Sequence, residues 1–147
     1  MGEIVQNVLS FGYHEFEERE GFHRYPCLDL FVDGKNLTDF FPDYAQYVTP
    51  FAIGYKDLRD ELGPLEEYRG MRLPEDAYGL PFLICGECHD PHCGGVWGKL
   101  RFDGQEVIWQ DFSVGDGNLS FRFDRQHYFA VLARLEEEIR RLHSSNQ

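Results

Sequence analysis

The sequence has no long apolar run and few basic residues. No apolar stretch approaches the ~20 residues that a membrane-spanning helix needs, and the amino terminus lacks the charged segment and apolar core of a signal peptide. We therefore expect a cytoplasmic protein. Lys and Arg number 14 against 26 Asp and Glu, which gives a net charge of −12. Proteins that bind the nucleic-acid backbone neutralise phosphates with basic side chains, so direct binding of nucleic acid is not expected.

The residue patterns of several common active sites are also missing. The sequence shows no recognisable Ser/His/Asp arrangement, no phosphate-cradling glycine loop and no H-E-x-x-H motif. Cys85 and Cys88 have the spacing of a thioredoxin pair, but Pro91 and two glycines follow where that motif needs the start of a helix. These absences favour a binding protein over an enzyme.

The composition that is present predicts one packed domain. Hydrophobic residues make up 42% of the chain and aromatic residues 16%, with 13 Phe and 8 Tyr. A chain of 147 residues is long enough to bury one core but not two, so we expect a single domain over residues 1–147.

Strand patterns dominate the first and last thirds of the chain. Leu28–Val32 predicts a strand that ends in a tight turn at Asp33-Gly34. Residues 96–102 and 105–112 flank Asp103-Gly104 and predict a hairpin. A two-residue turn there pairs Phe102 with Gln105, Arg101 with Glu106, Leu100 with Val107 and Gly98 with Trp109. In this register Val96, Leu100, Phe102, Val107 and Trp109 share a buried side. A third strand is expected at about 118–123.

A helix is predicted to end the chain. Asp124 has the short acceptor side chain that caps a helix, and apolar residues then recur at helical spacing, at Tyr128, Val131, Leu132, Leu135, Ile139 and Leu142. Residues 36–79 look loop-like, with one short helix at about 56–62 that Gly63-Pro64 should stop. The order of elements predicts an α+β fold: an antiparallel sheet packed by a C-terminal amphipathic helix, with a Cys/His loop.

That loop holds the one cluster with metal-ligand spacing. Cys85, Cys88 and Cys93 lie within nine residues, and three thiolates with one further ligand suit a structural zinc ion. The predicted ligands are Cys85, Cys88, Cys93 and His92. His89 and Cys27 remain alternatives for the fourth position, and Cys27 requires the early strand to lie beside this loop. Free thiols are the simpler alternative, and an open coordination position would instead favour a metal- or thiol-dependent enzyme.

The same region resembles a group of short bacterial proteins of unknown function. The spacing Cys85-x-x-Cys88-x4-Cys93, followed by residues 107–112 (VIWQDF), is similar to their C-x-C-G-E-x-G-C loop and V-x-W-x-x-F strand. The resemblance covers about residues 80–130, and Leu28–Phe41 is similar to their usual opening. It implies a bacterial origin and a shared fold, but it assigns no catalytic residue. The chain departs from the pattern in the two-residue first gap and in the histidines between the cysteines.

Acidic and aromatic residues alternate in the middle of the chain, between Asp39 and Glu67. Aromatic side chains anchor many protein interfaces, and carboxylates around them speed the encounter with a basic partner. The predicted partner-binding residues are Asp39, Asp43, Tyr44, Tyr47, Asp57, Asp60 and Glu61. The alternative is that the aromatic residues, such as Phe40, Phe41, Phe51 and Tyr55, are core, with the acids simply solvated.

These observations predict a small acidic binding protein. The leading hypothesis is an immunity protein or inhibitor that neutralises a basic protein, such as a toxin nuclease. A nucleic-acid mimic that blocks a DNA-binding enzyme is a close alternative. A metal- or thiol-dependent enzyme that uses the cluster at 85–93 is the alternative from a different class.

Overall fold

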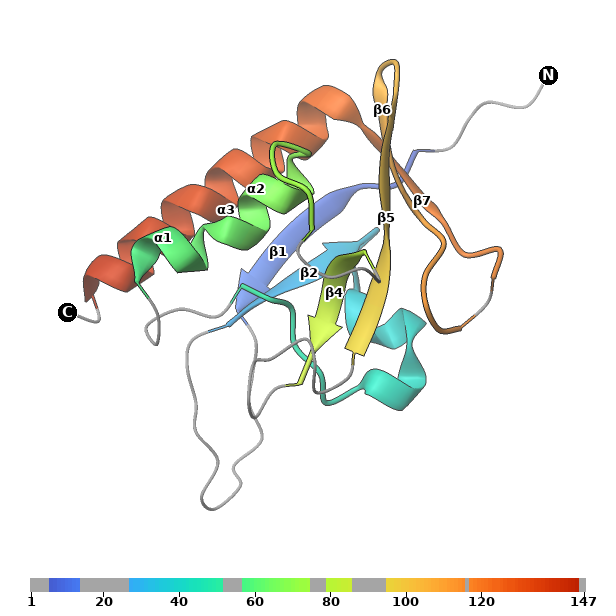
Figure 1. Cartoon of the computed structure of the whole chain (residues 1–147), viewed down its shortest axis with the longest axis horizontal. Coiled ribbons are helices and arrows are strands. Elements are labelled where there is room, and N and C mark those ends of the chain that lie inside the picture. Colours follow the sequence, from blue (N-terminus) through green and yellow to red (C-terminus); the bar gives the residue numbers. More distant parts are fainter. Residues whose placement is uncertain are drawn as a thin grey trace.

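Two antiparallel sheets and a long C-terminal helix form the described part of the chain (Figure 1). The computed structural model describes residues 6–13, 27–51, 57–74, 79–85, 95–115 and 117–145. The α+β class and the packing of a C-terminal helix on antiparallel strands are confirmed. The predicted single sheet is present as two sheets, and most of the predicted Cys/His loop lies outside the described residues.

The first sheet contains β1 (Leu9–Tyr13), β2 (Leu28–Val32) and β3 (Lys35–Asn36), with β2 in the centre. The predicted turn between β2 and β3 is confirmed, because Asp33 and Gly34 have φ values of 54° and 78°. Both values are positive, as a type I′ turn requires. Leu28, Leu30 and Val32 are fully buried on the core side of β2.

The second sheet has the order β4 (Leu80–Ile84), β5 (Gly95–Asp103), β6 (Glu106–Gln110) and β7 (Phe121–Asp124). The strand expected at about 118–123 is therefore present as β7. β4 was not predicted from the sequence. All five residues of β4 are buried, so it lacks the alternation of polar and apolar residues that marks a strand with one face in water.

The hairpin of β5 and β6 forms at the predicted place, but in a different register. Its turn is Gly104-Gln105, so Leu100 lies opposite Trp109, and Asp103 stays in the strand opposite Glu106. The predicted pairs were wrong by two positions along one strand. Side chains alternate with a period of two, so this shift leaves the predicted faces unchanged.

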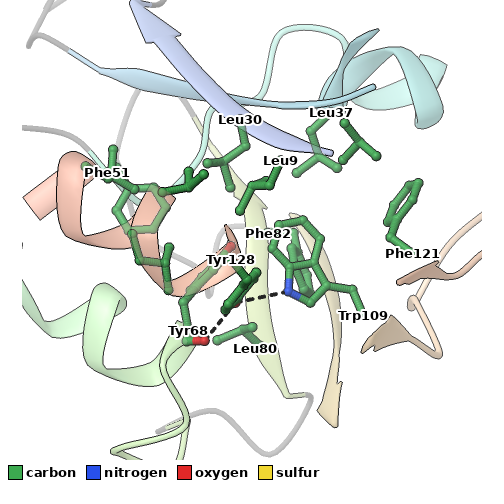
Figure 2. Close-up of a cluster of buried hydrophobic side chains, with 14 of the residues drawn as sticks. Leu9, Leu30, Leu37, Phe51, Tyr68, Leu80, Phe82, Trp109, Phe121 and Tyr128 are labelled. Carbon is green, nitrogen blue, oxygen red and sulfur yellow. Dashed lines mark hydrogen bonds between the residues drawn. The ribbon is translucent and has the colours of Figure 1, made fainter. Parts of the chain in front are cut away.

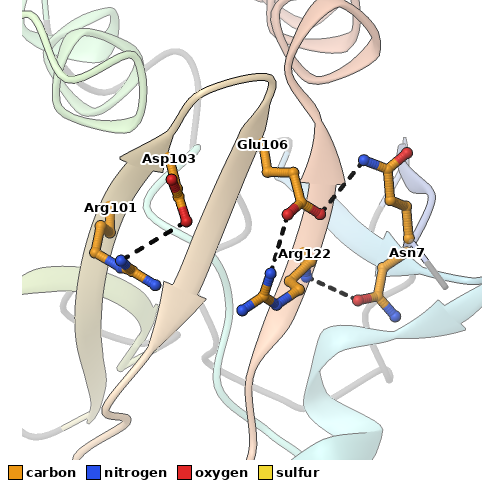
Figure 3. Close-up of polar contacts among 6 residues, drawn as sticks. Asn7, Arg101, Asp103, Glu106 and Arg122 are labelled. Carbon is orange, nitrogen blue, oxygen red and sulfur yellow. Dashed lines mark hydrogen bonds and ion pairs between the residues drawn. The ribbon is translucent and has the colours of Figure 1, made fainter. Parts of the chain in front are cut away.

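The burial of the hairpin confirms those faces. Val96, Val107 and Trp109 are fully buried, and Leu100 and Phe102 pack against the core from its edge. The predicted pair of Arg101 with Glu106 is not formed. Arg101 instead lies 4.0 Å from Asp103, and Glu106 pairs with Arg122 of β7 at 2.9 Å (Figure 3).

Two isolated bridges connect the second sheet to other parts of the chain. Asn7, just before β1, pairs with Phe123 of β7, and its backbone N–H donates to the Arg122 carbonyl at 2.6 Å. At the other side, Val48 pairs with Ile84 of β4. Side chains from both sheets pack into one shared core.

The C-terminal helix α3 spans Arg125–Ser145, and the prediction for it is confirmed. The Asp124 carboxylate accepts a hydrogen bond from the His127 backbone N–H at 2.9 Å, as an N-cap does. The predicted apolar stripe is buried at Tyr128, Val131, Leu132, Leu135 and Ile139.

A chain of hydrogen bonds runs through the aromatic core (Figure 2). The Trp109 indole N–H donates to the Tyr128 hydroxyl at 3.2 Å, which donates to the Tyr68 carbonyl at 2.7 Å. The Tyr68 hydroxyl donates to the Pro81 carbonyl at 2.7 Å. Each of these three buried donors thus has a partner, and the bonds tie α3 and Tyr68 to β6 and β4 of the second sheet.

The middle of the chain contains more helix than predicted. Two 3₁₀ turns, η1 (Leu37–Phe40) and η2 (Pro42–Tyr44), follow β3. The short helix expected at 56–62 is α1 (Leu58–Glu61). Gly63-Pro64 does not end the helical region, because it begins α2 (Gly63–Tyr68). Proline is well suited to the first turn of a helix, where its missing N–H has no partner to lose.

An ion pair between the end of α2 and α3 gives the fold a testable pH dependence. Arg69 and Arg140 donate to the Glu136 carboxylate at 2.7 and 3.0 Å, and these bonds hold its pKa below the ordinary 4.5. A depressed carboxyl pKa adds stability above the unfolded-state value, and this stability is lost as the pH falls through the folded-state value. We expect Glu136→Gln to lose less stability than the wild type between about pH 5 and pH 3, measured by urea unfolding. If the free energy of unfolding falls with pH by the same amount in both proteins, the proposed contribution of Glu136 is contradicted.

Candidate functional site

The segment from η1 to Tyr47 carries the part of the predicted site that faces solvent. Asn36 caps η1, because its side-chain oxygen accepts from the Thr38 backbone N–H at 3.0 Å. Backbone hydrogen bonds then continue from Tyr44 N–H to the Phe41 carbonyl at 2.8 Å and from Tyr47 N–H to the Tyr44 carbonyl at 3.0 Å. The segment is thus a series of closed turns with a defined backbone.

Buried side chains fix these turns to the core. Leu37 is fully buried and Phe41 is 2% exposed. The Phe40 ring meets Phe121 of β7 edge-on at 5.0 Å between centroids, and Phe41 lies 5.3 Å from Phe112. The segment is therefore a rigid part of the domain surface, anchored from below by aromatic contacts.

Four predicted partner-binding residues come together on this segment, and we call Asp39, Asp43, Tyr44 and Tyr47 the acidic aromatic platform. Asp39 and Asp43 are exposed, whereas the two tyrosines are half-buried. The Tyr44 and Tyr47 rings meet edge to face with centroids 4.8 Å apart. The platform thus presents apolar ring surface beside two carboxylates.

The negative charge of the platform is not neutralised within the described residues, where neither Asp39 nor Asp43 forms an ion pair. The nearby ammonium group of Lys35 lies over the Phe40 ring, 4.5 Å from its centroid. By contrast, Glu106 and Glu136 are each bonded to arginine. The platform is therefore a surface on which carboxylates remain available to a partner.

Asp57 and Asp60, also predicted to bind a partner, lie elsewhere. Both are exposed on α1 or just before it. Figure 1 shows α1 beside the end of α3, whereas the cyan turns of η1 and η2 lie on the opposite side of the molecule. One compact partner surface does not join these two pairs of acids, so the predicted site is divided.

Glu61 requires a correction, because its carboxylate does not face solvent. The residue is 2% exposed, and its side-chain oxygen lies 2.7 Å from Nδ1 of His143 in the last turns of α3. The pair fastens α1 to the end of the long helix. Glu61 is therefore a structural residue in this conformation, and the sequence held no signal for a partner 82 positions away.

The Glu61–His143 pair leads to a prediction about stability. Replacing His143 with alanine removes a hydrogen-bond partner from a buried carboxylate, which should lower the free energy of unfolding by about 1–3 kcal/mol. The measurement is urea unfolding at neutral pH, followed by circular dichroism. The same change in a Glu61→Gln background should cost less, because no buried charge is then left behind. Equal losses in both backgrounds would show that the two side chains are not coupled.

The core alternative is confirmed for several aromatic residues of the middle segment. Phe41, Phe51 and Tyr68 are almost completely buried, and Phe40 is partly buried. Tyr55 lies outside the described residues. Tyr44 and Tyr47 thus provide the aromatic surface of the predicted site.

The predicted metal site falls mainly outside the described residues. This applies to Cys88, His89, His92 and Cys93, whereas Cys85 is described directly after β4 and is half-buried. Among the described residues, no group of three or more His, Cys, Asp or Glu side chains is placed to hold a metal ion.

Cys27, an alternative fourth ligand, packs against the end of β4. It is 1% exposed and packs with Val48 and Ile84, and Ile84 directly precedes Cys85. The start of β2 therefore lies beside the end of β4, and the loop from residue 86 to residue 94 lies outside the described residues. Burial raises the pKa of the Cys27 thiol to about 12, with a further contribution from Asp29. Without a metal this thiol is protonated at neutral pH and is a poor nucleophile.

Comparisons with known proteins do not identify a function for the residues described above. No helix among the described residues is long and apolar enough to span a membrane. The resemblance to short bacterial proteins stays a prediction. Comparisons with protein-family models, curated proteins and solved structures find no match for this chain.

Proposed function

We propose that this protein is a small acidic binding protein that inhibits a basic protein partner, as an immunity protein inhibits a toxin nuclease. The observation that carries the proposal is the acidic aromatic platform, in which exposed Asp39 and Asp43, which form no ion pair with another described residue, lie on one segment with half-buried Tyr44 and Tyr47. The net charge of −12 has the same sign as this surface.

Each part of the platform supports a different step of binding. Carboxylates without a local partner attract lysine and arginine side chains and raise the rate of encounter. Tyrosine rings already held in place gain contact area on binding with little loss of conformational freedom. Because Leu37 and Phe41 fix the segment from below, binding does not first have to order it.

The proposal is tested by expressing the protein together with the product of a neighbouring reading frame and recording a native mass spectrum. We expect an equimolar complex with a chain of high isoelectric point. Loss of the complex in an Asp39→Lys, Asp43→Lys variant would support the platform as the contact surface. Asp57→Lys, Asp60→Lys is the matched control, because it makes the same charge change on the α1 side. Equal loss in both variants would contradict a localised site.

The nucleic-acid-mimic alternative predicts a different competitor. A mimic occupies the nucleic-acid site of its target, so double-stranded DNA should displace it from the complex. An inhibitor that binds elsewhere on a nuclease is not displaced by DNA. Competition with a short duplex, followed in the same native mass spectra, separates the two.

We also propose a structural zinc ion held by Cys85, Cys88 and Cys93 with His92, His89 or Cys27 as the fourth ligand. The cysteine spacing and the position of Cys27 beside Ile84 support it. Elemental analysis of the purified protein should find close to one zinc per chain. Removal of the metal by a chelator should lower the unfolding midpoint, because a structural site binds the folded chain far more tightly than the unfolded one. A metal-free protein with one rapidly alkylated thiol would contradict the site and favour the thiol-dependent enzyme.

A further inference from the structure

The turn after α2 holds two large apolar side chains out in solvent. Met71 is 75% exposed and Leu73 is 87% exposed, the highest values among the large hydrophobic residues that the structure describes. Single exposed apolar residues are normal, but two within one short turn form an apolar surface that a partner can cover.

The backbone of this turn is fixed. The Gly70 N–H donates to the Glu67 carbonyl at 3.0 Å, and the Met71 N–H donates to the Glu66 carbonyl at 2.9 Å. With Gly70 at φ 73°, these bonds form a Schellman motif at the end of α2. A Cβ on Gly70 would lie 2.4 Å from the Phe102 ring, so the turn sits directly against β5. Met71 and Leu73 are thus presented by a backbone that is already ordered.

Guanidinium groups border this apolar surface. The Phe102 and Phe129 rings stack with centroids 6.1 Å apart and 8° between their planes. The Arg125 guanidinium lies over both rings, 5.2 and 5.8 Å from their centroids. Arg125 also donates to the Gly104 carbonyl at 3.3 Å. Arg72, between Met71 and Leu73, is exposed, and its guanidinium lies 4.0 Å from the exposed Glu66 carboxylate. We call Met71–Leu73 with Phe102, Phe129 and Arg125 the arginine-bordered turn.

We propose that the arginine-bordered turn of one copy binds the acidic aromatic platform of a second copy. The two surfaces are complementary in both respects: Asp39 and Asp43 would meet Arg72 and Arg125, and the tyrosine rings would cover the apolar side chains of the turn. The inference rests on the proposed role of the platform as a surface for basic groups.

The positions of the arginine-bordered turn and the acidic aromatic platform determine whether copies would pair face to face or join head to tail. Figure 1 shows the turn after α2 beside α3, whereas the cyan turns that carry the platform lie at a different end of the molecule. Each copy can therefore bind one neighbour at each surface, in a head-to-tail arrangement that grows with concentration. A basic partner that binds the platform should compete with the turn of the neighbouring copy and dissociate this assembly. The target of the proposed inhibitor would therefore convert the assembly into single inhibitor chains.

The test is sedimentation velocity of the full chain over a wide range of concentration at low salt. We expect the weight-average sedimentation coefficient of the wild type to rise with concentration, and that of Leu73→Asp to stay at the monomer value. Leu73 is exposed and away from the core, so its replacement should leave the fold intact, which circular dichroism checks. A wild type that stays monomeric throughout, or an unchanged rise in Leu73→Asp, would overturn the inference.

A charge swap makes the test specific. Variant A carries Arg72→Glu and Arg125→Glu, and variant B carries Asp39→Lys and Asp43→Lys. Each alone has two surfaces of like charge and should stay monomeric, whereas an equimolar mixture should associate again, because every contact then joins opposite charges. A mixture that stays monomeric, while the wild type associates, would overturn the proposed pairing of surfaces. Failure of this inference is separable from failure of the proposed function, because Leu73→Asp should still capture the basic partner.

Discussion

Replacement of Trp109 by alanine should lower the free energy of unfolding by about 3–5 kcal/mol, the range for a large aromatic residue deleted from a packed core. Trp109 is fully buried, and its ring contacts Phe82 and Phe123 at centroid distances of 4.8 and 4.7 Å. Its indole N–H also donates to the Tyr128 hydroxyl. The change therefore removes apolar contact and one buried hydrogen bond together. Urea unfolding followed by far-ultraviolet circular dichroism measures it without using tryptophan fluorescence.

Two further variants serve as comparisons: one retains a ring at position 109, and the other is a surface control. Trp109→Phe keeps a buried ring but removes the indole donor, so it should cost less than Trp109→Ala. Met71→Ala removes a large side chain that is 75% exposed and should change stability by no more than about 0.5 kcal/mol. A loss below about 1 kcal/mol for Trp109→Ala would contradict the central place of this residue in the core.

Reversing the charge of the platform should produce the largest effect on binding. With a purified basic partner, Asp39→Lys together with Asp43→Lys should lower the association rate constant by roughly 10- to 1,000-fold at low salt. The cause is the replacement of attraction by repulsion at the point of contact. Stopped-flow mixing measures the rate constant directly.

The matched control has the same net charge as the platform variant. Asp57→Lys with Asp60→Lys changes the overall charge by the same amount, but on the α1 side of the molecule. It should slow association less, because local fields act within about one Debye length, ~8 Å at physiological ionic strength. If both double variants slow association equally, the overall charge is responsible and the platform is not the contact surface.

The parts of the fold that depend on local patterns were predictable. The cap at Asp124 and the apolar stripe from Tyr128 to Ile139 are encoded within a few neighbouring residues, and α3 follows both. The turn at Asp33-Gly34 combines Asp, which tolerates a positive φ value, with Gly, which adopts one at no steric cost. In each case the residues that determine the structure are adjacent in the sequence.

The parts that depend on distant residues were not predictable. The hairpin register differs by two positions because Gly104, with φ 58°, begins the turn while Asp103 remains in the strand. Both registers place the same residues on the buried face, so the apolar pattern does not distinguish them. Likewise, Glu61 has the sequence context of a solvated acid, and its burial depends on His143 at the end of another helix.

The candidate site shows the same division. The sequence identified Asp39, Asp43, Tyr44 and Tyr47, which are close together in the chain and are carried by one segment. It also grouped them with Asp57 and Asp60, because a linear sequence does not show that α1 lies beside the end of α3, away from η1 and η2.

The central claim is that the acidic surface exists to bind a basic protein, and the salt dependence of the association rate constant tests it most directly. The account predicts a steep fall in this rate constant as salt rises from low ionic strength to about 1 M, where the Debye length is near 3 Å. The fall should be much shallower in the Asp39→Lys, Asp43→Lys variant. A wild-type rate constant that does not change over this range would contradict the account.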